Sequence, residues 1–442
     1  MTAVAKCGKI RAYRSRKFWS RYIDIMFKRL KSHPLFDTLI NLRGNPRYCV
    51  YTEPLWGIPY YLLSPFIALY MSKLGLSDLE IGAVATVTMA FQMVFSFVSG
   101  PLTDKFGRRK TTFWCDILSW SIPSLLWAFA QGFWWFVAAA VLFAVNMISS
   151  NSWQCLLVEE ADQGKLVYMF TWLTISGLVS VFLAPLSGAL VEKYTVVPVM
   201  RVLYLIAFLL MTVKFFVLYF YSAETPQGKI RLAETRGVSL LLLCAQCKGV
   251  VLAMLKDKKT VRVIAIIVLF NIQAVVSGNF FPLYVTGSLG IPDRYVAYFP
   301  IIRSVVMLAF IFGAQHLLSK LRFRAPMLIG LALYAAATVF LITPGLDGLA
   351  RAVIYTLFES FAYAIVAPRK DSLVAMHIDP HERARIMGLV YVLMFAASAP
   401  FGWIAGALAS LDRALPFCLN IAVFCAFGAA VAFFEDVKDV KG

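Results

Sequence analysis

The stretch Gly100-Pro101-Leu102-Thr103-Asp104-Lys105-Phe106-Gly107-Arg108-Arg109-Lys110 places a short, strongly basic turn between two long apolar segments. These segments, residues 80–99 and 112–130, are each long enough to cross a hydrocarbon layer of roughly 30 Å as helices that rise about 1.5 Å per residue. The core of a soluble protein is not organised in this way. The turn is therefore predicted to be a hairpin between two helices at the edge of a membrane.

The rest of the chain repeats this alternation of apolar runs and short polar turns. Of its 442 residues, 60% are hydrophobic and 15% are charged, and the mean hydropathy is +0.74. This composition predicts an all-α, multi-pass membrane protein. Twelve spans are expected, at residues 55–72, 80–99, 112–130, 133–156, 166–190, 199–221, 261–287, 295–318, 325–343, 348–368, 386–409 and 413–434.

The net charge of +18 could by itself indicate a nucleic-acid partner, but in a membrane chain the placement of Lys and Arg matters more than their sum. If the N-terminus is cytoplasmic, the loops on the opposite side contain only Lys73, Lys193, Arg201, Arg294 and Arg413. The positive-inside rule then places both termini in the cytoplasm and the protein in the cytoplasmic membrane. No nucleic-acid partner is expected.

Two polar segments flank and divide the spans. Residues 1–50 form a basic leader whose aromatic and aliphatic residues recur at helical spacing, which fits either a helix on the anionic inner leaflet or a solvated tail that only sets topology. Residues 222–260 are expected to be a cytoplasmic linker with an interfacial helix. They separate a six-helix bundle at 51–221 from a second at 261–435, which residues 436–442 follow as a tail.

The two halves share a sequence pattern. Leu69-Tyr70 and Leu74-Gly75-Leu76-Ser77-Asp78 end the first span, and Leu283-Tyr284 and Leu289-Gly290-Ile291-Pro292-Asp293 end the seventh. Leu166-Val167-Tyr168 and Leu389-Val390-Tyr391 repeat in the same order. Such duplication predicts two pseudo-symmetric bundles that rock about a site held between them.

With twelve spans in two sixes and a basic hairpin after the second, the chain resembles the major facilitator superfamily. The resemblance covers roughly residues 50–435 and implies that the hairpin latches the two halves on the cytoplasmic side. It assigns this gate to Gly100, Asp104, Gly107, Arg108 and Arg109, with the glycines allowing close approach and a sharp turn. Asp104 would face the positive end of a helix in the opposite half and pair with the nearby arginines. Alternatively, the basic residues only obey the positive-inside rule.

The resemblance also implies that the first, fourth, seventh and tenth spans line a central cavity, with help from the second, fifth, eighth and eleventh. Polar and aromatic residues on those spans are the expected substrate-binding group, because polar side chains in a bilayer point away from lipid. The alternative is hydrogen bonding between helices without a substrate. The group comprises Glu53, Trp56 and Tyr60 on the first span, Asn146, Ser150, Asn151 and Gln154 on the fourth, and Asn271 and Gln273 on the seventh.

Charged residues inside spans give a further prediction. Glu359 lies eight residues beyond Arg351, and Arg303 lies nine beyond Arg294, so both should sit about 12 to 14 Å in from the same edge. A pair at that depth could couple transport to protons, or it could be purely structural. Lys214 on the sixth span is expected instead to extend toward the cytoplasm.

These observations favour a secondary active transporter that takes up a small organic solute by proton symport, acting as a monomer without metal or cofactor. Proton-coupled efflux of drugs or metabolites is the alternative. A non-transporting membrane sensor that reuses the fold is a further one. A membrane enzyme is disfavoured, because the four histidines have no metal-binding spacing and no nucleotide-binding glycine loop is present.

Overall fold

The computed structural model describes residues 34–162, 165–245, 256–313, 323–377 and 383–433, and every regular element in these ranges is a helix. Within these ranges nine helical segments are long and apolar enough to cross a membrane. They are Asp78–Phe106, Phe133–Val158, Tyr168–Tyr194, Val196–Tyr221, Thr260–Gly287, Arg324–Ile342, Gly348–Lys370, Gly388–Leu411 and Leu415–Ala432.

The other three predicted spans are interrupted. The first consists of α4 (Glu53–Leu63), the 3₁₀ turn η1 (Ser64–Phe66) and α5 (Ile67–Lys73). The third consists of α7 (Arg108–Asp116), the π-helical turn η2 (Ile117–Ser121) and α8 (Ile122–Ala128). The eighth begins with η4 (Asp293–Tyr298) and α18 (Phe299–Gly313), then runs into residues outside the described ranges. The count of twelve therefore stays a prediction.

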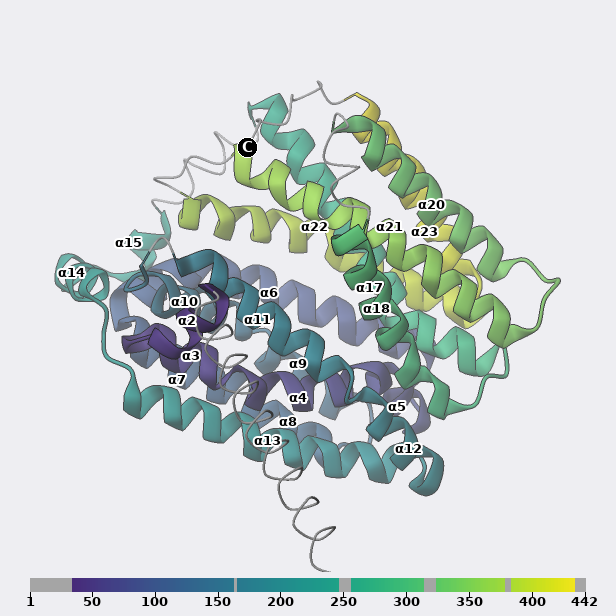
Figure 1. Ribbon diagram of the computed structural model, residues 1–442, viewed down its shortest axis with the longest axis horizontal. Coiled ribbons are helices and arrows are strands. Elements are labelled where there is room, and N and C mark those ends of the chain that lie inside the picture. The colour runs from purple at the N-terminus through teal and green to yellow at the C-terminus, as the bar shows by residue number, and fades with distance from the viewer. Residues whose placement is uncertain (1–33, 163–164, 246–255, 314–322, 378–382, 434–442) are drawn as a thin grey trace, which may run out of the picture.

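The helices before residue 222 pack together, in purple to teal in the lower part of Figure 1. Their centre is aromatic: the buried Tyr70 ring lies 5.8 Å from Phe136 and 5.7 Å from Tyr204, and its hydroxyl donates to the Trp127 carbonyl at 2.8 Å. Besides α4, α5, α7 and α8, they are α2 (Pro34–Asn41), α3 (Gly44–Tyr51), α6 (Asp78–Phe106), α9 (Phe133–Phe143), α10 (Asn146–Val158), α11 (Leu166–Val181), α12 (Ala184–Tyr194) and α13 (Val196–Tyr221).

The helices after residue 256 form the green to yellow upper part of the same view. Here α20 packs against both α21 and α23, with Tyr334 stacked on Phe424 at 4.9 Å. They are α17 (Lys258–Gly287), α18, α20 (Arg324–Ile342), α21 (Gly348–His377), α22 (Arg383–Leu411) and α23 (Leu415–Ala432).

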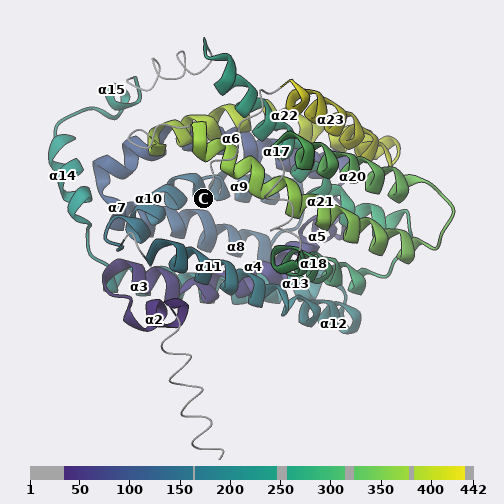
Figure 2. The ribbon, with the colours of Figure 1, turned by 45° about the horizontal axis from the view of Figure 1, so that its top comes forward.

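The linker between the halves begins with α14 (Pro226–Glu234) and α15 (Leu240–Ala245), at one end of the molecule (Figures 1 and 2). Most of the interfacial helix predicted there falls in residues 246–255, outside the described ranges. Residues 1–33 of the leader also lie outside them, while its last part forms α2 and α3. The domain boundaries drawn from the sequence stay predictions.

Helices α6 and α22 form the closest joint between the halves, and both views show them side by side (Figures 1 and 2). A Cβ at position 82 would overlap the carbonyl oxygen of Gly402 and lie 2.9 Å from the Cα of Gly406. Thr86 donates to the Ala399 carbonyl at 2.8 Å and accepts from the Trp403 N–H at 2.8 Å. Only glycine permits backbones to approach this closely, as in small-residue crossings of membrane helices.

The repeated segments also share local structure. Gly75 and Gly290 both have positive φ, 90° and 67°, in the turn that follows the preceding helix. Three residues later, Asp78 begins α6 and Asp293 begins η4. The sequence match at 74–78 and 289–293 therefore corresponds to one turn used twice.

Candidate functional site

The basic hairpin turns at Gly107. This residue has φ +83°, a conformation that side chains penalise, and it separates α6 from α7. The predicted sharp turn is not at Gly100, which lies inside α6 without a positive φ, and a Cβ added there would meet nothing within 4 Å. Its role in the gate stays a prediction. Helix α6 continues to Phe106, so the chain turns at Gly107, seven residues after Gly100.

Arg108 is the centre of an ionic cluster at this hairpin, and it is only 4% exposed. Its guanidinium lies 3.0 Å from Asp104 Oδ1 and 3.2 Å from Glu159 Oε1 at the end of α10. Burial lowers the Arg108 pKa, but the charges of Glu159 and Asp104 outweigh it and raise the pKa overall. Arg108 therefore stays charged, and Thr225 completes the cluster by donating to Glu159.

Glu224 in the linker holds the start of α7. Its carboxylate accepts from the backbone N–H groups of Arg108 at 2.8 Å and Arg109 at 3.1 Å, which are otherwise unpaired at a helix N-terminus. Arg109 lies over the Tyr219 ring, 4.5 Å from its centroid, and donates to the Tyr219 carbonyl at 2.7 Å. The hairpin is thus bound to its own half and to the linker.

Of the predicted partners of Asp104, only Arg108 is confirmed. Arg109 is directed to Tyr219 instead. Within the described ranges the Asp104 carboxylate pairs inside its own half, so the latch between halves stays a prediction. The contacts of Glu159 and Glu224 with the hairpin were not predicted from the sequence.

The other end of the molecule is closed by ion pairs between the halves. Lys73 at the end of α5 lies 2.9 Å from Asp293, and Asp78 at the start of α6 binds Arg413 through two contacts of 2.8 and 3.2 Å. A third pair joins Glu192 on α12 to Arg294 on η4. Asp78 and Asp293 occupy matching positions of the repeat, and each binds a basic residue of the opposite half. The sequence analysis recorded these basic residues but did not pair them.

Within the first half, a cavity of about 290 Å³ brings together charged and aromatic side chains. Lys214 lies 2.7 Å from Glu53 and is 5% exposed, so the expectation that it extends toward the cytoplasm was wrong. The reason is a better partner: Glu53 supplies a carboxylate at the depth where the lysine leaves α13. The lining also includes the predicted Trp56, Asn146 and Ser150, together with Asp116, Trp120, Met147, Ser149, Trp153 and Phe215.

A second cavity, of about 440 Å³, adjoins the first through the shared residue Trp120. Trp120 lies in the π-helical turn η2, a type of irregularity often found at functional sites. Tyr60 lines this cavity as predicted, and α17 contributes Val275 and Asn279. Most of the lining is apolar, including Leu63, Val84, Trp127, Phe136 and Phe143.

The remaining predicted binding residues do not join these cavities. Gln273 donates to Ser277 at 3.2 Å, and Ser277 accepts from Asn420 on α23 at 3.1 Å, so this group ties helices of the second half together. Asn271 and Asn151 line neither cavity, and Gln154 is exposed. Asn279 is the polar residue of α17 that lines the second cavity.

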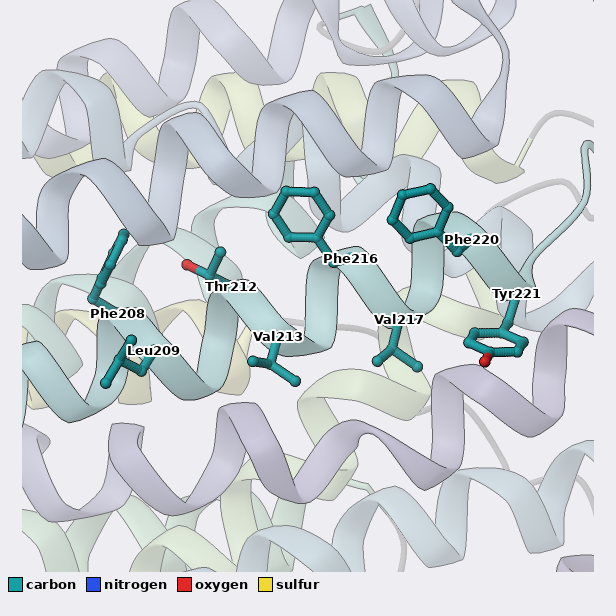
Figure 3. A pocket seen from close by; sticks show the side chains of 8 residues that line it. All are labelled: Phe208, Leu209, Thr212, Val213, Phe216, Val217, Phe220 and Tyr221. Carbon is teal, nitrogen blue, oxygen red and sulfur yellow. The ribbon is translucent and has the colours of Figure 1, made fainter.

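A third hollow can be set aside as a solute site. Its eight lining residues all come from α13, as Figure 3 shows, and Thr212 and Tyr221 are the only polar ones. Leu209 is 60% exposed and Phe220 is 67% exposed. A shallow apolar groove on the outer surface of one helix suits contact with lipid tails.

Arg303 and Glu359 lie together as predicted. Arg303 Nη2 is 2.8 Å from Glu359 Oε1, and the guanidinium carbon lies 4.2 Å from the centroid of the Tyr363 ring. Glu359 is 6% exposed. In this pair the carboxylate is buried, whereas the Arg303 side chain is 39% exposed.

The amino-acid sequence matches a known protein family over most of its length. Residues 56–402 match the profile of the Major Facilitator Superfamily. The chain belongs to this family of transporters. In this member the hairpin motif is tied to the linker, and the opposite end carries the ion pairs between halves.

Curated relatives match over part of their length. The chain is 28% identical over 169 residues to the multidrug resistance protein MdtG of Salmonella paratyphi A, covering 37% of this chain and 41% of the relative. It is 30% identical over 152 residues to MdtG of a Rahnella species, covering 33% and 36%. The matched region thus spans less than half of these relatives.

Solved structures share the fold over most of the chain. The nucleoside transporter NupG superposes with a TM-score of 0.66 at 15% identity, covering 89% of this chain and 99% of NupG. A peptide transporter of the POT type, in complex with sulfate, superposes with a TM-score of 0.62 at 15% identity, covering 88% and 93%. At these identities the likeness concerns the fold alone.

Proposed function

We propose that the protein is a secondary active transporter that moves a small organic solute across the cytoplasmic membrane by alternating access. The observation that carries the proposal is the reciprocal pairing of Asp78 with Arg413 and of Asp293 with Lys73. Two repeat-related halves held at one end by exchangeable ion pairs have the construction that a rocking bundle requires. By the positive-inside prediction, the closed end faces the outside.

We assign proton coupling to Glu359 with Arg303. When a buried carboxylate gives up its arginine partner and takes up a proton, its own charge changes by one unit. Its partner lies on another helix, α18, so a relative movement of α18 and α21 alters the pair directly. The adjoining Tyr363 ring holds the guanidinium in place when the carboxylate is protonated. We place proton symport first, as the sequence analysis did.

Proton-coupled efflux is the second candidate, and the resemblance to multidrug resistance proteins favours it. The large apolar and aromatic cavity between α4, α6, α8 and α17 would suit hydrophobic solutes. Both candidates use the same coupling pair and differ in whether solute and proton move together.

Transport by purified protein in proteoliposomes tests the proposal. A panel of labelled organic solutes is offered with an imposed proton gradient of either sign, while a pH-sensitive dye reports proton flux. Solute-dependent proton flux is expected. In symport the solute accumulates on the side toward which protons flow, and in antiport it accumulates on the side from which they flow. Facilitated solute movement without proton flux would contradict the coupling, and the absence of any solute-dependent flux would favour the sensor.

A further inference from the structure

We propose that the 290 Å³ cavity of the first half binds the ammonium group of an amine-bearing solute. The side-chain ammonium group of Lys214 occupies the same site and competes with the solute. This inference rests on the proposed transport function and names the class of solute for it. The described lining contains two carboxylates, Glu53 and Asp116, and three tryptophans, Trp56, Trp120 and Trp153.

Lys214 already shows how an ammonium group is held there. Its Nζ lies 2.7 Å from Glu53 Oε2, 5.7 Å from the centroid of the Trp56 ring and 5.6 Å from that of Trp153. A carboxylate with aromatic faces around a cation is the arrangement that recognises alkylammonium groups in general. The lysine is therefore bound as a ligand would be.

The charges in the cavity leave room for a second cation. Among the described residues that line it, Lys214 is the only basic one, and its ion pair is with Glu53. Asp116, which is 7% exposed, lines the same cavity, and no second basic residue of the described lining balances its charge. When Asp116 is ionised, the formal charge of the cavity is one negative unit, so a bound ammonium group is paired and an anion is repelled.

An unpaired acceptor points to the same chemistry. Asn146 is 8% exposed, and its side-chain oxygen has no hydrogen-bond partner among the described residues. A buried acceptor without a donor is costly, and an ammonium N–H would satisfy it. Asn146 lies in the lining with Asp116 and Trp153, so carboxylate, ring and acceptor belong to one cavity.

Binding of benzylamine, which is protonated at pH 7, tests this assignment by equilibrium dialysis of purified full-length protein in detergent. Benzoate and benzyl alcohol serve as the anionic and neutral probes of similar size. Lys214→Met removes the tethered competitor and is expected to tighten benzylamine binding about tenfold, while Asp116→Asn weakens it about tenfold. Lys193→Met, at a lysine over Tyr194 outside the cavity, leaves binding unchanged.

Two results would overturn the inference. One is benzoate binding that Lys214→Met abolishes, since Lys214 would then be an anchor for anions. The other is benzylamine binding with the same affinity in the wild type, in Lys214→Met and in Asp116→Asn. If Lys214→Met does not fold, unchanged affinity in Asp116→Asn is sufficient. The binding experiment uses no proton gradient, so it is independent of the transport proposal. If benzylamine binds with this pattern but no flux occurs in proteoliposomes, the transport proposal is wrong and the binding inference stands.

Discussion

Arg108 illustrates at the residue scale how much a motif reveals. Its spacing from Asp104 predicted a local ion pair, and the structure contains that pair at 3.0 Å. The motif did not reveal Glu159 or Glu224, because the approach of α10 and the linker to the hairpin depends on chain segments 51 and 116 residues away. Local pairs can be predicted from spacing, whereas long-range partners cannot.

Glu224 provides a test of the hairpin's attachment. Glu224→Ala removes the acceptor for two N–H groups at the start of α7, so we expect stability to fall by about 1 to 2 kcal/mol, as for other lost helix caps. Thermal unfolding in detergent measures the effect. Glu234→Ala is the matched control, because Glu234 is exposed and pairs with Arg231 on its own helix. Equal unfolding temperatures for the two variants would contradict the capping role.

Glu359 provides a test of coupling. Glu359→Gln keeps the shape of the side chain but removes its charge, so we expect gradient-driven accumulation to be lost while exchange of internal for external solute persists. Counterflow and accumulation in proteoliposomes measure the two activities. A purely structural ion pair would instead lose both together, and unchanged accumulation would also exclude the coupling role.

At the scale of elements, the close crossing of α6 and α22 depends on glycines, which have no side chain to keep the two backbones apart. The glycines at positions 82, 402 and 406 let the two backbones touch, and Thr86 adds hydrogen bonds at the same place. The sequence analysis predicted both helices but not their contact. Glycines at helical spacing indicate that another helix can pack closely there, but they do not indicate which helix it is.

Gly82→Ala and Gly278→Ala form a matched pair of substitutions inside long helices. A Cβ at position 82 would overlap the Gly402 carbonyl, so we expect a loss of about 1 to 3 kcal/mol, as for other overpacked contacts. A Cβ at position 278 would meet nothing within 4 Å, so the better helix propensity of alanine should leave stability unchanged or raise it by about 0.5 to 1 kcal/mol. Thermal unfolding in one detergent compares them, and similar losses in both would contradict the close crossing.

At the scale of the whole molecule, the ion pairs at one end define the state of the transporter. Asp78, Asp293 and Glu192 each bind a basic residue across the boundary between halves. The partly exposed pairs of Asp78 with Arg413 and of Asp293 with Lys73 are each worth roughly 0.2 to 1 kcal/mol. Under the proposed alternating access, these two pairs together are strong enough to bias the conformational equilibrium and weak enough to break in each transport cycle.

The double substitution Asp78→Asn and Asp293→Asn tests this bias. Loss of both pairs should cost about 0.4 to 2 kcal/mol, which shifts the equilibrium away from the closed end by a factor of about 2 to 30. Hydrogen–deuterium exchange of residues 287–298 should accelerate accordingly. Glu234→Gln, which breaks an exposed pair at the other end, is the control. Unchanged exchange in the double variant would show that packing alone closes this end.

The membrane class, nine of the predicted spans, the repeat and the Arg303–Glu359 pair could be predicted from the amino-acid sequence alone. All of these follow from hydropathy, periodicity and depth along single helices, which are properties of the chain read in order. The packing of the helices was needed to show that Lys214 pairs with Glu53, that Gln273 donates to Ser277 on its own helix, and that Asp78 and Asp293 pair across the halves at one end. Each of those contacts depends on how helices pack, and hydropathy does not specify which faces of two apolar helices meet.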